Sequence, residues 1–165
     1  MPIILGVDPG SRLTGFGIIR SNGSEHHYLA SGCVRTEKGE FNQRLLQIYQ
    51  ALKEIIQRYK PEEAAVEQVF MHKNASSALK LGHARGAAII AVVEYIEVVA
   101  EYSPRQIKQA VIGYGGAEKI QVQQMVQRLL HLNALPQADA ADALAVAICH
   151  ANSRDMLRLL AEEGL

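Results

Sequence analysis

Four carboxylates stand at positions in this sequence where they could hold metal ions. Asp8 follows the apolar run "IILGV", and Glu67 ends the short apolar segment "EAAVE". Asp139 and Asp142 begin the otherwise apolar stretch "ADAADALAVAI", three residues apart and therefore on one face of a helix. Carboxylates gathered in one place repel one another unless a cation neutralises them. Because these hard oxygen ligands have no His or Cys beside them, they predict Mg²⁺, with Mn²⁺ able to substitute.

Each of these acids also has an ordinary structural explanation. Asp139 could be a helix N-cap, and Asp142 an acid favoured by the helix dipole, which is the simpler interpretation for those two alone. Asp8 precedes Pro-Gly and could belong to a turn. Glu67 is harder to explain in this way, because apolar residues stand on both sides of it. Taken together, the four acids favour a site over coincidence.

The elements that must position these acids follow from the hydrophobic pattern. The first 36 residues predict a three-strand meander, and the rest of the chain alternates between helix and strand patterns. Ser103 and Pro104 are typical first residues of a helix. We expect strands at 3–8, 15–20, 27–36, 63–68 and 96–102, and helices at 41–59, 75–95, 103–112, 118–132 and from 139 onward.

This order of elements predicts an α/β fold, with a mixed five-stranded sheet flanked by helices. Ligands of such sheets gather at the carboxyl ends of the strands. If the first and fourth strands are parallel neighbours, Asp8 and Glu67 meet at one edge. A last helix packed across the sheet could then bring Asp139 and Asp142 to the same place.

Composition limits the class of protein. The chain has 165 residues, 48% of them hydrophobic and 21% charged, which is ordinary for a globular domain. Its two cysteines are far apart and form no metal-binding motif, which argues against a disulfide scaffold or a zinc site and suits a reducing cytoplasm. The first residues lack the pattern of a signal peptide, and "GAAIIAVV" is too short to span a bilayer. We therefore expect a cytoplasmic protein without a membrane segment.

The distribution of charge leaves two interpretations open. The net charge is zero, which by itself speaks against a nucleic-acid-binding protein. Basic residues nevertheless cluster in two segments, 69–93 and 102–132, which contain Glu118 as their one acid. On charge alone, a basic face and ordinary solvated helix faces are equally compatible with the sequence. The basic residues of the two segments are Lys73, Lys80, Arg85, Arg105, Lys108, Lys119 and Arg128.

Several long blocks resemble one family in the right order. These blocks are "ILGVDPGSRLTGFGII", "VEQVFMHKNASSALKLGHARGAA", "RQIKQAVIGYGGAEKIQVQ" and "PQADAADALAVAICH". They resemble the RuvC family of bacterial Holliday-junction resolvases, from the first strand to about residue 151. The resemblance implies a ribonuclease H-like nuclease domain at 1–151, followed by a C-terminal extension at 152–165. The acidic end "LAEEGL" differs from the basic tail of some relatives.

The resemblance also implies an activity and its partners. We expect a homodimer that resolves four-way DNA junctions by paired, Mg²⁺-dependent nicks in recombination and repair, with RuvA and RuvB as branch-migration partners. The family's catalytic acids fall on Asp8, Glu67, Asp139 and Asp142, its aromatic residue near the crossover on Phe70, and its two lysines on Lys108 and Lys119. With the basic segments, this gives a predicted DNA-binding set of Phe70, Lys73, Lys80, Arg85, Arg105, Lys108 and Lys119.

The chemistry of phosphodiester hydrolysis agrees with this expectation. Two Mg²⁺ ions about 4 Å apart can activate water and clamp both in-line oxygens. Lys119 could offset charge on the phosphate, although it could also be a solvated lysine at a helix start, where the helix dipole disfavours it. Pattern alone makes Lys108 a residue of a solvated helix face, and Phe70 could be a core anchor instead of a stacking residue.

Three other functions remain open at this point. "GVDPG" is similar to the phosphate loop of actin-like sugar kinases, so the chain could be a fragment of a phosphotransferase, although 165 residues hold one such domain where those enzymes need two. A DNA-binding module without catalysis is a second alternative, which the four intact acids oppose. A nuclease of the same fold that acts on another nucleic-acid structure is the third.

Overall fold

The computed structural model describes residues 1–36, 38–68, 74–113 and 115–164. In this part of the chain, the structure has five strands and five helices. The strands are β1 (Ile3–Asp8), β2 (Leu13–Ser21), β3 (His26–Arg35), β4 (Glu63–Glu67) and β5 (Val98–Tyr102). The helices are α1 (Phe41–Tyr59), α2 (Ala75–Val93), α3 (Pro104–Ile112), α4 (Lys119–Leu129) and α5 (Ala138–Glu162).

The strands form one mixed sheet in the order β3-β2-β1-β4-β5. The meander β1-β2-β3 is antiparallel, whereas β4 pairs in parallel with both β1 and β5. Val7 of β1 lies opposite Val66 of β4, so the residues that follow them, Asp8 and Glu67, end adjacent strands at the same edge. The α/β prediction, the mixed sheet and the parallel pairing of the first and fourth strands are confirmed.

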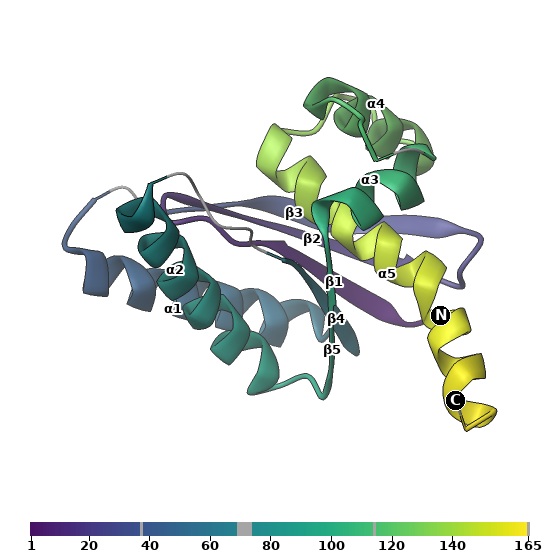
Figure 1. Cartoon of the computed structure of the whole chain (residues 1–165), viewed down its shortest axis with the longest axis horizontal. Helices are drawn as coiled ribbons and strands as arrows, with labels where there is room; N and C mark the ends of the chain where they lie inside the picture. The colour runs from purple at the N-terminus through teal and green to yellow at the C-terminus, as the bar shows by residue number, and fades with distance from the viewer. Residues whose placement is uncertain (37, 69–73, 114, 165) are drawn as a thin grey trace.

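Helices cover both faces of the sheet (Figure 1): α1 and α2 lie on one face, and α3, α4 and α5 on the other. The apolar side chains of β1 pack against the helices on both faces of the sheet, because alternate residues of a strand point to opposite faces. Leu5 packs with Ile48 of α1 on one side, and Ile4 packs with Leu144 of α5 on the other. All four side chains are fully buried, as the continuous apolar pattern predicts.

Helix α5 lies unusually close to β1 and β2 because glycines face it. A Cβ atom on Gly6 would stand 2.1 Å from the Ala143 carbonyl oxygen, and one on Gly15 would stand 2.1 Å from the Asp139 carbonyl oxygen. Both distances are shorter than any real contact, so larger residues would push the helix away. These glycines therefore fix the distance between α5 and the sheet, and with it the position of the first turn of α5, which carries Asp139.

The ends of several elements differ from the sequence-based expectation. Helix α2 ends at Val93, two residues early, and β5 begins at Val98 after a turn. Helix α4 ends at Leu129, shortly before His131 adopts a left-handed conformation with φ 53°. The interpretation of Asp139 as an N-cap is wrong: Gln137 is the N-cap of α5, and its side chain accepts a hydrogen bond from the Ala140 N–H.

Helix α5 continues without a break to Glu162, and its last turns extend past the sheet (Figure 1). Its buried residues end at Ala151, and Ser153 and Arg154 are the partly buried positions among the described residues that follow. The proposed division into 1–151 and 152–165 stays a prediction. None of the helices in the described ranges is long and apolar enough to cross a membrane.

Candidate metal centre

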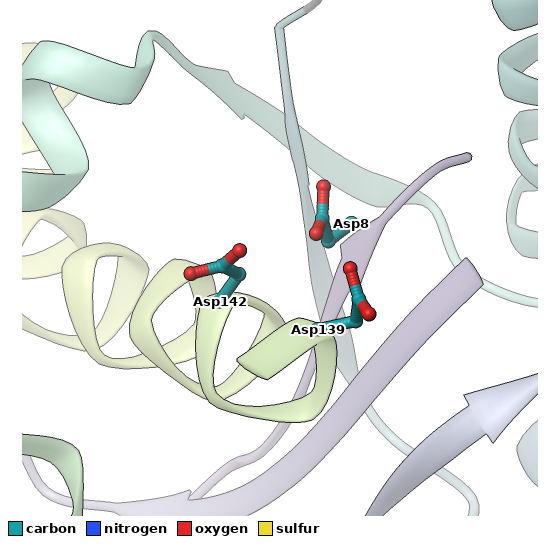
Figure 2. A group of neighbouring side chains, drawn as sticks. All are labelled: Asp8, Asp139 and Asp142. Carbon is teal, nitrogen blue, oxygen red and sulfur yellow. The ribbon is translucent and has the colours of Figure 1, made fainter. Parts of the chain in front are cut away.

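The acids predicted from the sequence meet at the carboxyl ends of β1 and β4. One oxygen from each of Asp8, Asp139 and Asp142 lies within 4.8 Å of the other two. Figure 2 shows these three side chains gathered between the end of β1 and the first turns of α5. Glu67 is not one of this close group of three, but it ends the next strand beside Asp8 and contributes to raising the pKa of Asp8. We call Asp8, Glu67, Asp139 and Asp142 the acidic cluster.

Burial and crowding change the protonation of this cluster. Burial raises the pKa of Asp8 to about 9, with further contributions from Glu67, Asp142 and Asp139. Burial also raises the pKa of Asp142 to about 6, although the nearby Lys119 opposes this increase. Without a cation the cluster therefore keeps at least one proton at neutral pH, because its carboxylates cannot all ionise so close together.

Among the described residues, Lys119 is the cation that pairs directly with these acids. Lys119, the first residue of α4, places Nζ 3.5 Å from Oδ2 of Asp142, and Asp142 in turn raises the pKa of Lys119. The lysine side chain is 70% exposed, so solvent screens much of this attraction. This ion pair therefore offsets the charge of the acids only in part. The cluster could hold a divalent cation, because it presents several hard oxygen ligands in one partly buried place.

A cavity beside the cluster brings both predicted lysines to the acids. Lys108 of α3 and Lys119 of α4 both line this cavity, together with two of the acids and with apolar residues of α3, α4 and α5. Its lining residues are Glu67, Pro104, Ile107, Lys108, Lys119, Val122, Asp142 and Ala145. A phosphate group held here would touch both positive charges and the acids together, which agrees with a role for these lysines at the site.

The other predicted DNA-binding residues have different surroundings. Lys80 of α2 and Arg105 of α3 are exposed near the starts of helices that follow the carboxyl ends of β4 and β5. Arg85 is 21% exposed and donates to Glu101 of β5 at 2.5 Å, so it is less accessible to DNA than expected. Phe70 and Lys73 lie outside the described residues.

Sequence reasoning missed two residues that support the site, Gln137 and Arg44. Gln137 contacts Asp139, although Gln is an uncommon N-cap and gives no signal in a sequence. Arg44 of α1 donates from Nη2 to the Ser11 carbonyl at 2.5 Å and so holds the loop that follows Asp8. Nothing in the local pattern of α1 indicates this contact, because its partner is 33 residues away in the chain.

The sheet order, the helices on both faces and the acids at the strand ends define a ribonuclease H-like fold. A family model described as crossover junction endodeoxyribonuclease RuvC matches residues 4–150. The match covers most of the chain, and this protein belongs to the RuvC family of crossover junction endodeoxyribonucleases. The resemblance identified from the four sequence blocks is confirmed.

Individual relatives agree with this assignment. Crossover junction endodeoxyribonuclease RuvC of Vibrio vulnificus strain CMCP6 is 60% identical over 164 residues, which cover 99% of this chain and 95% of the relative. The protein of that name from Aeromonas hydrophila subsp. hydrophila is 59% identical and covers 95% of this chain, with 91% of its own length matched. A solved structure of Thermus thermophilus RuvC in complex with a Holliday junction substrate has a TM-score of 0.87 at 34% identity, covering 94% of this chain and 96% of that chain.

Proposed function

We propose that this chain resolves four-way (Holliday) DNA junctions by paired symmetric nicks, as an endonuclease of homologous recombination and DNA repair. The observation that carries the proposal is the convergence of Asp8, Asp139 and Asp142, with Glu67 beside them, in a member of this endonuclease family. Several carboxylates gathered in one partly buried place fit hydrolysis of a phosphodiester, where cations balance both the acids and the substrate.

The proposed cofactor is Mg²⁺, with Mn²⁺ able to substitute and two ions in each active site. Asp8, Glu67, Asp139 and Asp142 would hold them, because these side chains offer carboxylate oxygens from three separate elements. When bound, such ions neutralise the phosphate, activate water and stabilise the leaving oxygen. The fit rests on the chemistry of the donor set and on the raised pKa of Asp8, which burial causes first and the neighbouring carboxylates increase.

The lysines of the cavity would position the substrate. Lys119 would hold a phosphate oxygen or offset the charge that develops on it, and Lys108, which lines the same cavity, would contact the DNA backbone. The cavity lining, as far as the structure describes it, contains no Ser or Cys that could attack the phosphate. Attack by water is therefore the proposed route.

The wider DNA-binding surface would include Lys80 and Arg105, which are exposed near the starts of α2 and α3, the helices that follow the carboxyl ends of β4 and β5. Phe70 and Lys73 belong to the proposal from the sequence alone. Phe70 stands three residues after Glu67, so its ring could stack on an unpaired base at the junction centre. Arg85 would contribute to DNA binding once its pairing with Glu101 is exchanged for a phosphate.

The proposed assembly is a homodimer, since matched nicks need two active sites related by the two-fold axis of the junction. A stripe of small and apolar residues on α2 supports a close contact with a second copy. Leu79 is 67% exposed, Ile90 58% and Val93 49%, and Gly82 and Gly86 lie between them on the same exposed face. The buried face of α2 uses other small residues, so this exposed stripe is not needed for the fold of one chain.

Further partners are proposed from the family alone. RuvA and RuvB, which move the branch point, are the proposed partners on the junction. Residues 152–165 are proposed as a C-terminal extension of the nuclease domain. Both cysteines are free, which suits the proposed location in a reducing cytoplasm.

The function can be tested with a synthetic four-way junction and a linear duplex of the same sequence, each incubated with and without Mg²⁺. We expect symmetric nicks in the junction alone, and these only with the cation. Equal cleavage of the duplex would instead favour a ribonuclease H-like nuclease with another substrate. Cleavage in excess EDTA would contradict the metal-dependent mechanism.

A further inference from the structure

Gln137 uses both ends of its side-chain amide beside the acidic cluster. Its Nε2 donates a hydrogen bond to Oδ2 of Asp139 at 2.8 Å. Its Oε1 accepts from the Ala140 N–H at 3.0 Å and from the Cys33 thiol at 2.8 Å. The two contacts to Oε1 decide which way the amide points, and so they direct the NH₂ group toward Asp139.

The pairing of the strands places Cys33, which contacts Gln137, in the same row of the sheet as Asp8. Asp8 of β1 pairs with Gly15 of β2, and Gly15 pairs with Cys33 of β3, so the three residues form one row across the sheet. The Asp139 carbonyl rests over Gly15, in the middle of that row. The first turn of α5 thus has a metal-ligand candidate on one side, Asp8, and the thiol that anchors Gln137 on the other.

We propose that Gln137, anchored by Cys33, is a positioning residue that fixes the Asp139 carboxylate for metal binding. The inference rests on the proposed function, because it assigns Asp139 to a metal. An aspartate side chain at a helix start can adopt several rotamers, and holding Oδ2 selects one of them in advance. The other oxygen, Oδ1, does not take part in this hydrogen bond and would be available to a metal ion. Hydrogen bonds to ligating carboxylates commonly change metal affinity by about 10- to 100-fold.

The test measures Mn²⁺ binding to the full-length, metal-free protein by calorimetry, together with the Mg²⁺ concentration that gives half-maximal junction cleavage. The main variant is Gln137→Ser, since serine is a strong N-cap that keeps α5 capped but cannot reach Asp139 in the same way. We expect Mn²⁺ affinity to fall about tenfold, with cleavage recovering at high Mg²⁺. The melting temperature of the metal-free protein should change little.

Variants of Cys33 test the anchor. Cys33→Ala removes a weak donor and should reduce Mn²⁺ affinity by about two- to threefold. Cys33→Ser keeps a donor and should bind Mn²⁺ like the wild type. Because Cys33 acts through Gln137, adding Cys33→Ala to Gln137→Ser should cause no further loss.

Gln123→Ala is the matched control, because Gln123 donates to the Pro136 carbonyl at 3.1 Å and so holds the same loop without contacting a carboxylate. We expect it to leave Mn²⁺ affinity unchanged. Unchanged Mn²⁺ affinity in Gln137→Ser would overturn the inference, as would an equal loss in Gln123→Ala. Failure of the proposed function would look different, because then Asp139→Asn would bind Mn²⁺ as tightly as the wild type.

Discussion

Strand β4 carries a glutamate at each end, and the two carboxylates have opposite surroundings. Glu63, at the amino end, receives a hydrogen bond from His150 Nε2 at 2.6 Å and two from Arg154, at 2.7 and 3.1 Å. These contacts, with that of Arg154 the largest, lower the pKa of Glu63. Glu67, at the carboxyl end, instead meets Asp8, whose pKa rises to about 9.

Both ends of the strand pack under the same helix, α5, but burial is the largest cause of the raised pKa of Asp8, whereas the hydrogen bond from Arg154 outweighs burial at Glu63. At the amino end, Tyr102 extends the contacts through its hydroxyl, 2.9 Å from His150 Nδ1. We call Glu63, Tyr102, His150 and Arg154 the Glu63 network. Arg154 supplies this network with a mostly buried positive charge, whereas among the described residues the cation paired with the acidic cluster is Lys119, whose side chain is 70% exposed. The comparison teaches that an acid closely paired within the chain serves stability, and a crowded group of acids with an exposed partner serves binding.

The largest effect is expected from neutralising single acids of the cluster. Asp8→Asn, Glu67→Gln and Asp139→Asn should each reduce junction cleavage by at least about 1000-fold, because each removes several kcal/mol of charge stabilisation from the transition state. Junction binding, measured by gel shift, should persist, since basic residues supply the affinity. Near-normal cleavage by any of the three would mean that the metal site is assigned to the wrong residues.

Breaking the Glu63 network should give the opposite result. Glu63→Ala leaves Arg154 and His150 without their carboxylate partner, and we expect a loss of about 2–3 kcal/mol in the free energy of unfolding, less than for a fully buried pair. The Mg²⁺ concentration needed for half-maximal cleavage should not change. The exposed neighbour Glu62 provides the control, and Glu62→Ala should change neither quantity. A changed Mg²⁺ requirement in Glu63→Ala would show that the Glu63 network affects metal binding at the other end of β4.

The acidic cluster and the Glu63 network should also differ in how they make stability depend on pH, although this effect is smaller. Asp8 has a pKa of about 9 in the folded protein, against an ordinary value of 3.8. Its contribution to folding stability is therefore fully present below pH 4 and is lost as the pH rises toward 9. Glu63 has a lowered pKa, so its contribution is present above its ordinary value of 4.5 and is lost as the pH falls below it. The melting temperature in EDTA should therefore decline from about pH 5 to pH 9, by about 2–4 °C for each kcal/mol lost.

Asp8→Asn is the control for this decline. It should flatten the slope in EDTA and raise the melting temperature at pH 8, because it removes a negative charge that burial and the neighbouring carboxylates oppose. Saturating Mg²⁺ should have the same flattening effect on the wild type. A melting temperature in EDTA that rises between pH 5 and 9 would contradict the account of Asp8.

Much of the acidic cluster could be predicted from sequence because its members stand where regular elements begin or end. The apolar run before Asp8 and the shorter one before Glu67 define strands, and parallel pairing then fixes where their ends meet. The spacing of Asp139 and Asp142 gives one helix face. The chemistry of these four residue types then indicates the kind of cation.

The Glu63 network could not be predicted in the same way. Its hydrogen bonds join residues 87 and 91 positions apart, and no local pattern records such a distance. The pairing of Arg85 with Glu101 was missed for a similar reason, since it depends on how α2 crosses β5. Local patterns predict elements and their ends, whereas the partner of a polar side chain depends on the packing of the whole chain.

The most direct test of this account compares Mn²⁺ binding to the metal-free wild type, Asp8→Asn and Glu63→Gln by calorimetry at pH 8. Both variants replace one carboxylate by an amide of nearly the same shape, one in the acidic cluster and one in the Glu63 network. We predict that Glu63→Gln binds Mn²⁺ as the wild type does, whereas Asp8→Asn binds at least about 100-fold more weakly. Equal binding by wild type and Asp8→Asn, or loss of binding in Glu63→Gln, would contradict the claim that the acidic cluster is the metal centre.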